Sequence, residues 1–265
     1  MRALTPAGQP SLAWGGSPPP HIPPGDLDDA ALARLYAYPE SRWLRANMVT
    51  SADGAGALEG KSAGLSSPAD MRLFGLLRVV TDVVLVGAGT ARTEQYKPAR
   101  RRPALADLRA ASVGQDRPLA PPIALVTRSM DLDLETPLFT EAPADARTIV
   151  ITCAGSPAGK RAAAARVADV IVAGDQVVDL EAALAALHDR GLGRVLCEGG
   201  PHLLGMLAAA GLLDELCLTV SPLLAGPGPG RVIGGAPSPA RPMTLGHILE
   251  EDGFLFCRYL VNGRR

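Results

Sequence analysis

The stretch RVLCEGGPHLLGMLAAA, residues 194–210, decides the fold that we expect for this chain. Its apolar start, Arg194–Cys197, predicts a buried strand, and Pro201 suits the first position of the helix that follows. Gly199 and Gly200 lie between these two elements. Two glycines before a helix leave its first backbone N–H groups open to an anion. The stretch therefore predicts a strand, a phosphate-binding turn and a helix; a plain strand-to-helix connection is the alternative.

A second buried strand that runs into glycines occurs earlier in the chain. Val83–Val86 predicts the strand, and Gly87 and Gly89 follow it directly. The turn departs from a Rossmann dinucleotide fingerprint, because Arg92 stands where the third small residue is required and no acidic residue ends the next strand. Two such glycine turns in one sheet still favour a binding site for a dinucleotide over two ordinary turns.

Further apolar runs of β-forming residues alternate with amphipathic segments. We expect additional strands at residues 43–50, 123–127, 148–152, 167–172, 216–220 and 254–261, and additional helices at 28–38, from 67 onward and at 179–190. This alternation predicts an α/β fold with a mostly parallel central sheet and helices on both faces. No clear helix separates the last two strands, so we expect an antiparallel pair at the C-terminal edge of the sheet.

Two segments differ from this alternation. Residues 1–25 are rich in Pro and Gly, which predicts a poorly ordered leader before a single domain over residues 26–265. Residues 97–121 have little strand or helix character beyond an alanine-rich stretch. A loop of that length is usually functional or mobile.

The composition argues against several classes of protein. The 265 residues carry a formal net charge of −1, without the clustered basic excess of a nucleic-acid-binding protein. We see no apolar segment of the roughly 20 residues that a membrane span needs and no signal peptide, so we expect a cytoplasmic protein. The four cysteines form no Cys-x-x-Cys pair and the four histidines show no metal spacing, so we expect no metal site.

Two further turns follow expected strands and carry polar side chains. Asp53, in the turn at residues 51–54, is suited to relaying a proton or only to forming the turn, since Asp-Gly is a common turn dipeptide. Arg128 between Thr127 and Ser129 suits a phosphomonoester such as the 2′-phosphate of NADP. A solvated surface arginine is the alternative.

Several of these segments occur together in one known family. They are WLRANMVTSADG at residues 43–54, VVLVGAGTARTEQY at 83–96 and VLCEGGPHLLGMLAAAGLLDELCLTVSPLLAG at 195–226. Over residues 43–260 the chain resembles the reductase domain of bacterial riboflavin biosynthesis. The resemblance implies a dihydrofolate-reductase-like fold, usually dimeric. It also implies an enzyme that uses NADPH to reduce the ribose of a 5-amino-6-ribosylamino-pyrimidinedione phosphate to ribityl.

The resemblance further implies where the ligands bind. The cofactor would contact Val49, Gly87, Gly89, Thr90, Glu94, Thr127, Arg128, Ser129, Gly199, Gly200, Pro201, His202, Leu203 and Leu204. The substrate would contact Asn47, Ser62, Arg101 and Glu198. Asp53 and Glu198 are the catalytic candidates, because a carboxylate could orient the substrate ring or assist protonation of the reduced nitrogen. Most of the rate would come from holding the nicotinamide hydride close to an electrophilic C=N carbon.

Three places depart from the family pattern at the expected substrate pocket. Asn47 replaces a common lysine, Gly64 replaces an aromatic residue, and EQYKP at residues 94–98 replaces an Asp-x-Pro-x-Leu run. These changes leave open the reduction of dihydrofolate or another pterin, and also a non-catalytic dinucleotide-binding protein. A deazaflavin in place of NADPH is a further alternative, since phosphate-binding turns do not identify the rest of the ligand.

Overall fold

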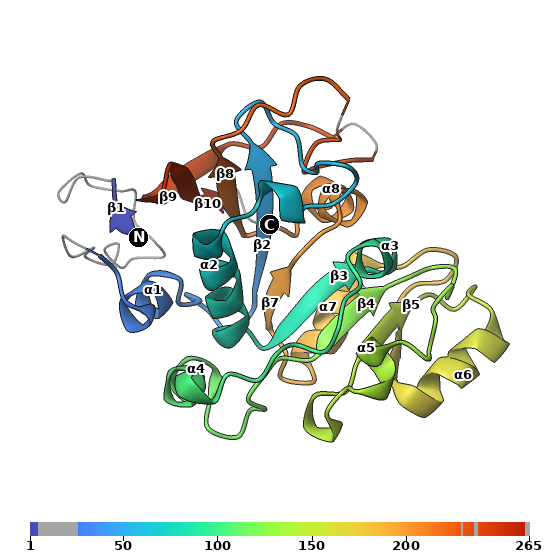
Figure 1. The fold of residues 1–265 in the computed structure, drawn as a ribbon. Coiled ribbons are helices and arrows are strands. Elements are labelled where there is room, and N and C mark those ends of the chain that lie inside the picture. Colours follow the sequence, from blue (N-terminus) through green and yellow to red (C-terminus); the bar gives the residue numbers. More distant parts are fainter. Residues whose placement is uncertain (5–25, 229, 236–237, 263–265) are drawn as a thin grey trace.

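The computed structural model describes residues 1–4, 26–228, 230–235 and 238–262. These residues form a ten-stranded sheet with helices on both faces (Figure 1). The strands are β1 (Arg2–Ala3), β2 (Trp43–Ser51), β3 (Val83–Gly87), β4 (Ile123–Val126), β5 (Ile149–Thr152), β6 (Asp169–Val172), β7 (Arg194–Cys197), β8 (Glu215–Ser221), β9 (Met243–Glu251) and β10 (Phe254–Val261). The helices are α1 (Asp29–Leu35), α2 (Pro68–Val79), α3 (Ala88–Thr93), α4 (Ala106–Val113), α5 (Pro137–Thr140), α6 (Ala158–Val167), α7 (Leu180–His188) and α8 (Pro201–Ala209), and short 3-10 helices cover Ala63–Leu65, Pro103–Leu105 and Ala144–Ala146.

The sheet is parallel over most of its width. The strand order is β1-β9-β10-β8-β2-β7-β3-β4-β5-β6, and every pair from β8 to β6 is parallel. β10 pairs antiparallel with β8 and β9, and β1 pairs antiparallel with β9. The expected mostly parallel α/β sheet with an antiparallel C-terminal edge is therefore confirmed. Its parallel strands all end at one edge, which is where ligands bind in open α/β sheets.

Two hydrophobic cores cover the two faces of this sheet. On one face α1 and α2 bury Leu32 and Leu76 against the strands. On the other face α7 and α8 bury Leu187 and Leu204. In Figure 1 the first pair of helices lies in front of the sheet and the second pair behind it. Helices therefore cover both faces, as the alternation of strands and helices predicts.

A fully buried group of charged side chains joins β2, β8 and β10. Glu215 Oε1 accepts hydrogen bonds from Arg45 Nε at 2.6 Å and Arg258 Nε at 2.7 Å, and no more than 1% of any of the three side chains is exposed. Trp43 Nε1 donates to the same carboxylate at 3.0 Å. Burial raises the pKa of Glu215, but the two guanidinium groups outweigh burial and lower the pKa to about 2. The group therefore links three strands by charge as well as by backbone pairing.

Several elements differ from the sequence-based expectations. The segment between the last two expected strands forms β9, and the alanine-rich part of residues 97–121 forms α4. Val167 ends α6 instead of beginning a strand. Arg2 and Ala3 pair with β9 instead of belonging to a poorly ordered leader, while residues 5–25 of that leader lie outside the described residues. The single domain over residues 26–265 stays a prediction.

Candidate active site

The two glycine turns meet at the carboxyl-terminal edge of the sheet. Gly87 ends β3 and Gly199 follows β7, and these two strands are parallel neighbours. The Gly87 amide donates a hydrogen bond to the Gly199 carbonyl at 2.8 Å. The expected convergence of the two turns on one surface is therefore confirmed.

Gly200 lies directly against Thr90 of α3. A Cβ atom at position 200 would lie 2.1 Å from Thr90 Oγ1, so the close approach of α3 and α8 requires glycine here. Gly200 is also the N-cap of α8 and provides no side-chain cap. The first-turn N–H groups of α8 are therefore left without a side-chain partner from the cap, as a phosphate site requires.

The remaining cofactor candidates on α8 divide into exposed and buried side chains. Pro201 and His202 are exposed. Leu203 and Leu204 are only 3% and 0% exposed and pack in the core. These two leucines therefore offer a ligand only their backbone, and their contact with the cofactor stays a prediction.

The turn after β4 lies beside α3. Thr127 is buried, and its hydroxyl accepts a backbone N–H from three residues further along the chain at 3.1 Å. Arg128 and Ser129 are exposed. Asp131 of the same turn forms an ion pair with Arg92 of α3 at 3.1 Å. The candidates for binding the 2′-phosphate therefore lie next to the glycine turns, although the Thr127 hydroxyl is already used inside its own turn.

Glu198, just before the second glycine turn, is held by Arg78 and Tyr96. Arg78 donates from Nε and Nη2 to the two carboxylate oxygens, each at 2.7 Å. The Tyr96 hydroxyl donates to Oε2, also at 2.7 Å. The Glu198 side chain is 2% exposed and the Arg78 side chain 19% exposed. Arg78 is therefore the member of the pair whose side chain is partly exposed, whereas the Glu198 carboxylate is buried, which corrects the expectation that this carboxylate itself faces the substrate.

Asp53 joins the turn after β2 to the segment after β8. Its carboxylate accepts hydrogen bonds from the Ser51 hydroxyl at 2.5 Å and from the backbone N–H groups of Ala225 at 3.1 Å and Gly226 at 2.8 Å. These bonds, that from Ser51 first, lower the pKa of Asp53 to about 2. Asp53 is thus a carboxylate at neutral pH, and its contacts are those of a loop anchor.

Ser62, a substrate candidate, contacts Glu94, a cofactor candidate. The Ser62 backbone N–H and hydroxyl both donate to Glu94 Oε1, at 2.9 and 3.0 Å. Ser62 precedes α2, and Glu94 directly follows α3. The contact therefore connects the loop before α2 to the end of α3, the helix that follows the first glycine turn.

Asn47 and Val49 lie on the half-buried end of β2. They alternate with Arg45, so their side chains share the face that α1 and α2 cover. Val49 pairs with Thr219, whose hydroxyl donates to Asp70 Oδ1 of α2 at 2.7 Å. The Asp70 carboxylate therefore links α2 to β8.

Arg101 lies apart from the other substrate candidates. Its guanidinium forms an ion pair with Asp145 at 2.6 Å. Asp145 precedes β5, so this contact belongs near the amino ends of the strands, whereas the glycine turns lie at their carboxyl ends. The structure therefore does not place Arg101 with the other substrate residues, which corrects that prediction.

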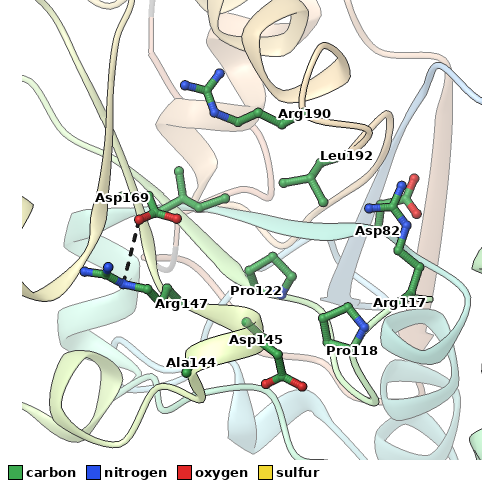
Figure 2. A pocket seen from close by; sticks show the side chains of 12 residues that line it. Asp82, Arg117, Pro118, Pro122, Ala144, Asp145, Arg147, Asp169, Arg190 and Leu192 are labelled. Carbon is green, nitrogen blue, oxygen red and sulfur yellow. Dashed lines mark ion pairs between the residues drawn. The ribbon is translucent and has the colours of Figure 1, made fainter.

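A pocket of about 400 Å³ lies at the amino-terminal edge of the sheet, away from the glycine turns (Figure 2). Its lining includes Asp82, Pro122 and Leu192, which come just before β3, β4 and β7, respectively. One ion pair lies within the pocket, Arg147 with Asp169 at 3.7 Å. The other two carboxylates of the lining, Asp82 and Asp145, pair with arginines outside it. The candidate active site is therefore the opposite edge, where the predicted residues gather.

Sequence reasoning missed three residues of that edge: Arg78, Tyr96 and Asp70. Arg78 is a basic residue in the last turn of α2, a place where arginine commonly serves the helix alone. Its partner Glu198 is 120 residues away, so no spacing rule connects them. Tyr96 stood out only as part of the EQYKP departure from the family pattern.

The sequence profile of the RibD C-terminal domain matches residues 42–251. The chain belongs to the RibD C-terminal domain family. The resemblance stated from the sequence is thereby confirmed, and it covers both glycine turns and the elements that hold Glu198.

This RibD C-terminal domain protein is similar to two archaeal enzymes named 2,5-diamino-6-ribosylamino-4(3H)-pyrimidinone 5′-phosphate reductase. That of Archaeoglobus fulgidus is 29% identical over 181 residues, which cover 68% of this chain and 80% of the relative. That of Methanothermobacter thermautotrophicus is 27% identical over 180 residues, covering 68% and 77%. A solved structure, a pyrimidine reductase-like protein from Corynebacterium diphtheriae, is 26% identical with a TM-score of 0.78 and covers 89% of this chain and all of that one.

Proposed function

We propose that this protein is an NADPH-dependent reductase of a ribosylamino-pyrimidine 5′-phosphate in riboflavin biosynthesis. The observation that carries the proposal is the backbone contact between Gly87 and Gly199, directly beside the Glu198–Arg78 pair. One edge of the sheet thus brings a phosphate-binding turn next to a charged group suited to a polar substrate. The names of the archaeal relatives support the choice of substrate.

The residues present fit a dinucleotide phosphate. The N-cap Gly200 leaves the first turn of α8 without a side-chain cap, and Thr90 fills the space that a side chain at position 200 would take. The first turn of α8 would hold the pyrophosphate, and Arg128 and Ser129 would hold the 2′-phosphate that distinguishes NADPH from NADH. Val49 would lie beside the nicotinamide ring, whose carbon 4 would supply the hydride.

The protein's own contribution to the reaction is mainly orientation. The ribosylamine first opens its ring: the bond from C1′ to the ring oxygen breaks, the oxygen takes the proton of the amine, and a C=N bond forms. C1′ then gains the hydride and the nitrogen gains a proton, so the ribosyl group becomes ribityl. Arg78, Asn47 and Ser62 would hold the substrate in place. Asp53 is already ionised, with a pKa of about 2, so we assign it to anchoring the loop instead of donating that proton.

Turnover tests the proposal directly. The protein is incubated with NADPH and the pyrimidine ribotide, and the absorbance of the reduced cofactor is followed; loss of absorbance with a ribityl product is expected. Turnover of dihydrofolate and not of the ribotide would show that the substrate is a pterin. Tight NADPH binding without hydride transfer to either compound would favour a non-catalytic role. If the protein does not bind NADPH but reduces the substrate with a reduced deazaflavin, the cofactor is a deazaflavin and not NADPH.

We further propose that the protein is a cytoplasmic homodimer. Met243 and Leu245 of β9 are 43% and 37% exposed, and they pair with Val261 and Tyr259 of β10. A second copy packed on this apolar part of the sheet would remove it from water. Within the described ranges, no helix has the length and apolar character of a membrane span. Light scattering after gel filtration tests the dimer, which requires twice the mass of one chain.

A further inference from the structure

Tyr96 connects the two glycine turns through its side chain. It follows α3, and its backbone N–H donates to the Ala91 carbonyl of that helix at 2.8 Å. Its hydroxyl donates to Glu198 Oε2 at 2.7 Å, immediately before the second turn. No other tyrosine of the described residues reaches this carboxylate. A single side chain therefore bridges the segment after β3 and the segment after β7.

The ring of Tyr96 also helps to hold Arg78. The Arg78 guanidinium lies 5.5 Å from the centre of the Tyr96 ring and 4.4 Å from that of Phe74. Contacts of a guanidinium with two aromatic rings restrict its position and partly replace its water. Tyr96 therefore acts on both members of the ion pair, through its hydroxyl on Glu198 and through its ring on Arg78.

The hydrogen bonds leave one end of the guanidinium available. Nε and Nη2 of Arg78 both donate to Glu198, which leaves Nη1 outside this pair of hydrogen bonds. The Arg78 side chain is 19% exposed, against 2% for Glu198. Three donors already fill three of the roughly four acceptor positions of the carboxylate. The free binding capacity of the group therefore lies on Arg78, as a charged donor.

Burial keeps Tyr96 in its donor form. Removal from water raises the pKa of the Tyr96 hydroxyl, and the neighbouring Glu198 carboxylate raises it further. The hydroxyl therefore keeps its proton over the whole range in which an enzyme is normally assayed.

We propose that Tyr96 is a positioning residue for substrate binding: it fixes Glu198 and Arg78 so that Arg78 Nη1 donates to an oxygen of the substrate. This role rests on the proposed function. The oxygen belongs either to the 5′-phosphate or to a carbonyl of the pyrimidine ring, since both are acceptors for a guanidinium.

The test is the variant Tyr96→Phe, which removes the hydroxyl and keeps the ring. Tyr38→Phe is a matched control, because Tyr38 also lies against an arginine (Arg45, 4.1 Å from its ring) and also donates from its hydroxyl, to Thr81 at 3.2 Å. Tyr96→Phe should raise KM for the pyrimidine ribotide about tenfold, as expected for losing one hydrogen bond to a charged group, with kcat changed less and the Kd of NADPH unchanged within about twofold. Tyr38→Phe should leave KM unchanged.

The ribonucleoside without its phosphate distinguishes the two oxygens. If Arg78 binds the phosphate, the unaltered protein and Tyr96→Phe should show the same KM for the nucleoside. If Arg78 binds a ring carbonyl, the variant should show the raised KM for both compounds. Either result supports the positioning role and identifies the acceptor.

Two results would overturn the role of Tyr96. One is an unchanged KM for the ribotide in Tyr96→Phe, while the unaltered protein turns it over. The other is an equal rise in KM in Tyr38→Phe. No turnover by the unaltered protein would instead overturn the proposed function, and the role with it. If the melting temperature shows that Tyr96→Phe does not fold, Arg78→Lys is tested instead. This variant keeps the positive charge but loses the paired N–H donors of the guanidinium, and it must show the same rise in KM.

Discussion

At the scale of single residues, Gly200 is the position where one added carbon should have the largest effect. In Gly200→Ala the new Cβ would meet Thr90 Oγ1, so the Thr90 side chain must rotate or α3 and α8 must move apart. We expect about 1–3 kcal/mol of destabilisation and roughly tenfold weaker NADPH binding. Fluorescence titration and urea denaturation measure the two effects. The double variant Thr90→Ala/Gly200→Ala removes the obstructing atom and should regain most of the lost stability; no recovery of stability would contradict the steric explanation.

Asp53 gives a prediction about pH. Its pKa of about 2 lies below its ordinary value, so the carboxylate is ionised over the whole assay range. We therefore expect Asp53→Asn to lower kcat/KM by the same factor at about pH 5.5 and about pH 8.5, through a loosened loop. A loss that changes with pH between these values would instead indicate that Asp53 transfers a proton. Steady-state rates across the range decide between the two.

The glycines of the site could be predicted from sequence, because a turn after a strand and before a helix has a local signature. Arg78 and Tyr96 could not, since their functional partner Glu198 is distant in the chain and only the folded sheet brings them together. The burial of the Leu203 and Leu204 side chains could not be predicted from the sequence for a related reason. Sequence position places them at the phosphate turn, but helical geometry turns their side chains into the core.

At the scale of elements, the charged group that joins β2, β8 and β10 should be costly to break. Glu215→Gln removes the one negative charge between Arg45 and Arg258, which are both fully buried. Breaking a buried ion pair in this way typically costs about 3–5 kcal/mol. Urea denaturation of the variant measures the loss. A variant in which leucine or methionine replaces all three charged residues should be markedly more stable than Glu215→Gln alone; equal instability would show that charge is not the cause.

Strands of the parallel region were predictable because their residues are almost continuously apolar, as in β3 and β5. β9 was not, because most of its residues are only half-buried or exposed and Gly246 interrupts its pattern. β9 exists because β10 offers it a partner, which is a tertiary effect. The helix α4 lies in the alanine-rich stretch, which was the only part of residues 97–121 with helical character. The long loop predicted for these residues is therefore shorter than expected.

At the scale of the whole molecule, His247 should make stability depend on pH. It is 2% exposed, and burial, followed by the charge of Arg258, lowers its pKa to about 3. An unfolded chain protonates this histidine near its ordinary pKa of 6.5, so the unfolded state binds the extra proton first as pH falls. Stability should therefore decrease below about pH 6.5, by about 2 kcal/mol at about pH 5.

Denaturation curves of the protein and of His247→Phe over this range test the prediction. Phenylalanine keeps an aromatic ring against Tyr36, whose ring centre lies 4.9 Å from that of His247. The variant should lose the pH dependence between about pH 6.5 and 5, before Glu215 or other carboxylates contribute. The same slope in both proteins would show that another group is responsible.

Glu198 and Gly199 are consecutive residues, and this adjacency has a thermodynamic consequence. The first belongs to the proposed substrate network, and the second accepts the Gly87 amide in the turn proposed to bind the cofactor. The two proposed ligands would therefore bind side by side, and each would supply part of the surface that the other contacts. Reciprocity then requires NADPH to increase the affinity for the pyrimidine by the same factor as the pyrimidine increases the affinity for NADPH. The two ligands should bind synergistically, and the ternary complex should be equally stable whichever ligand is added first.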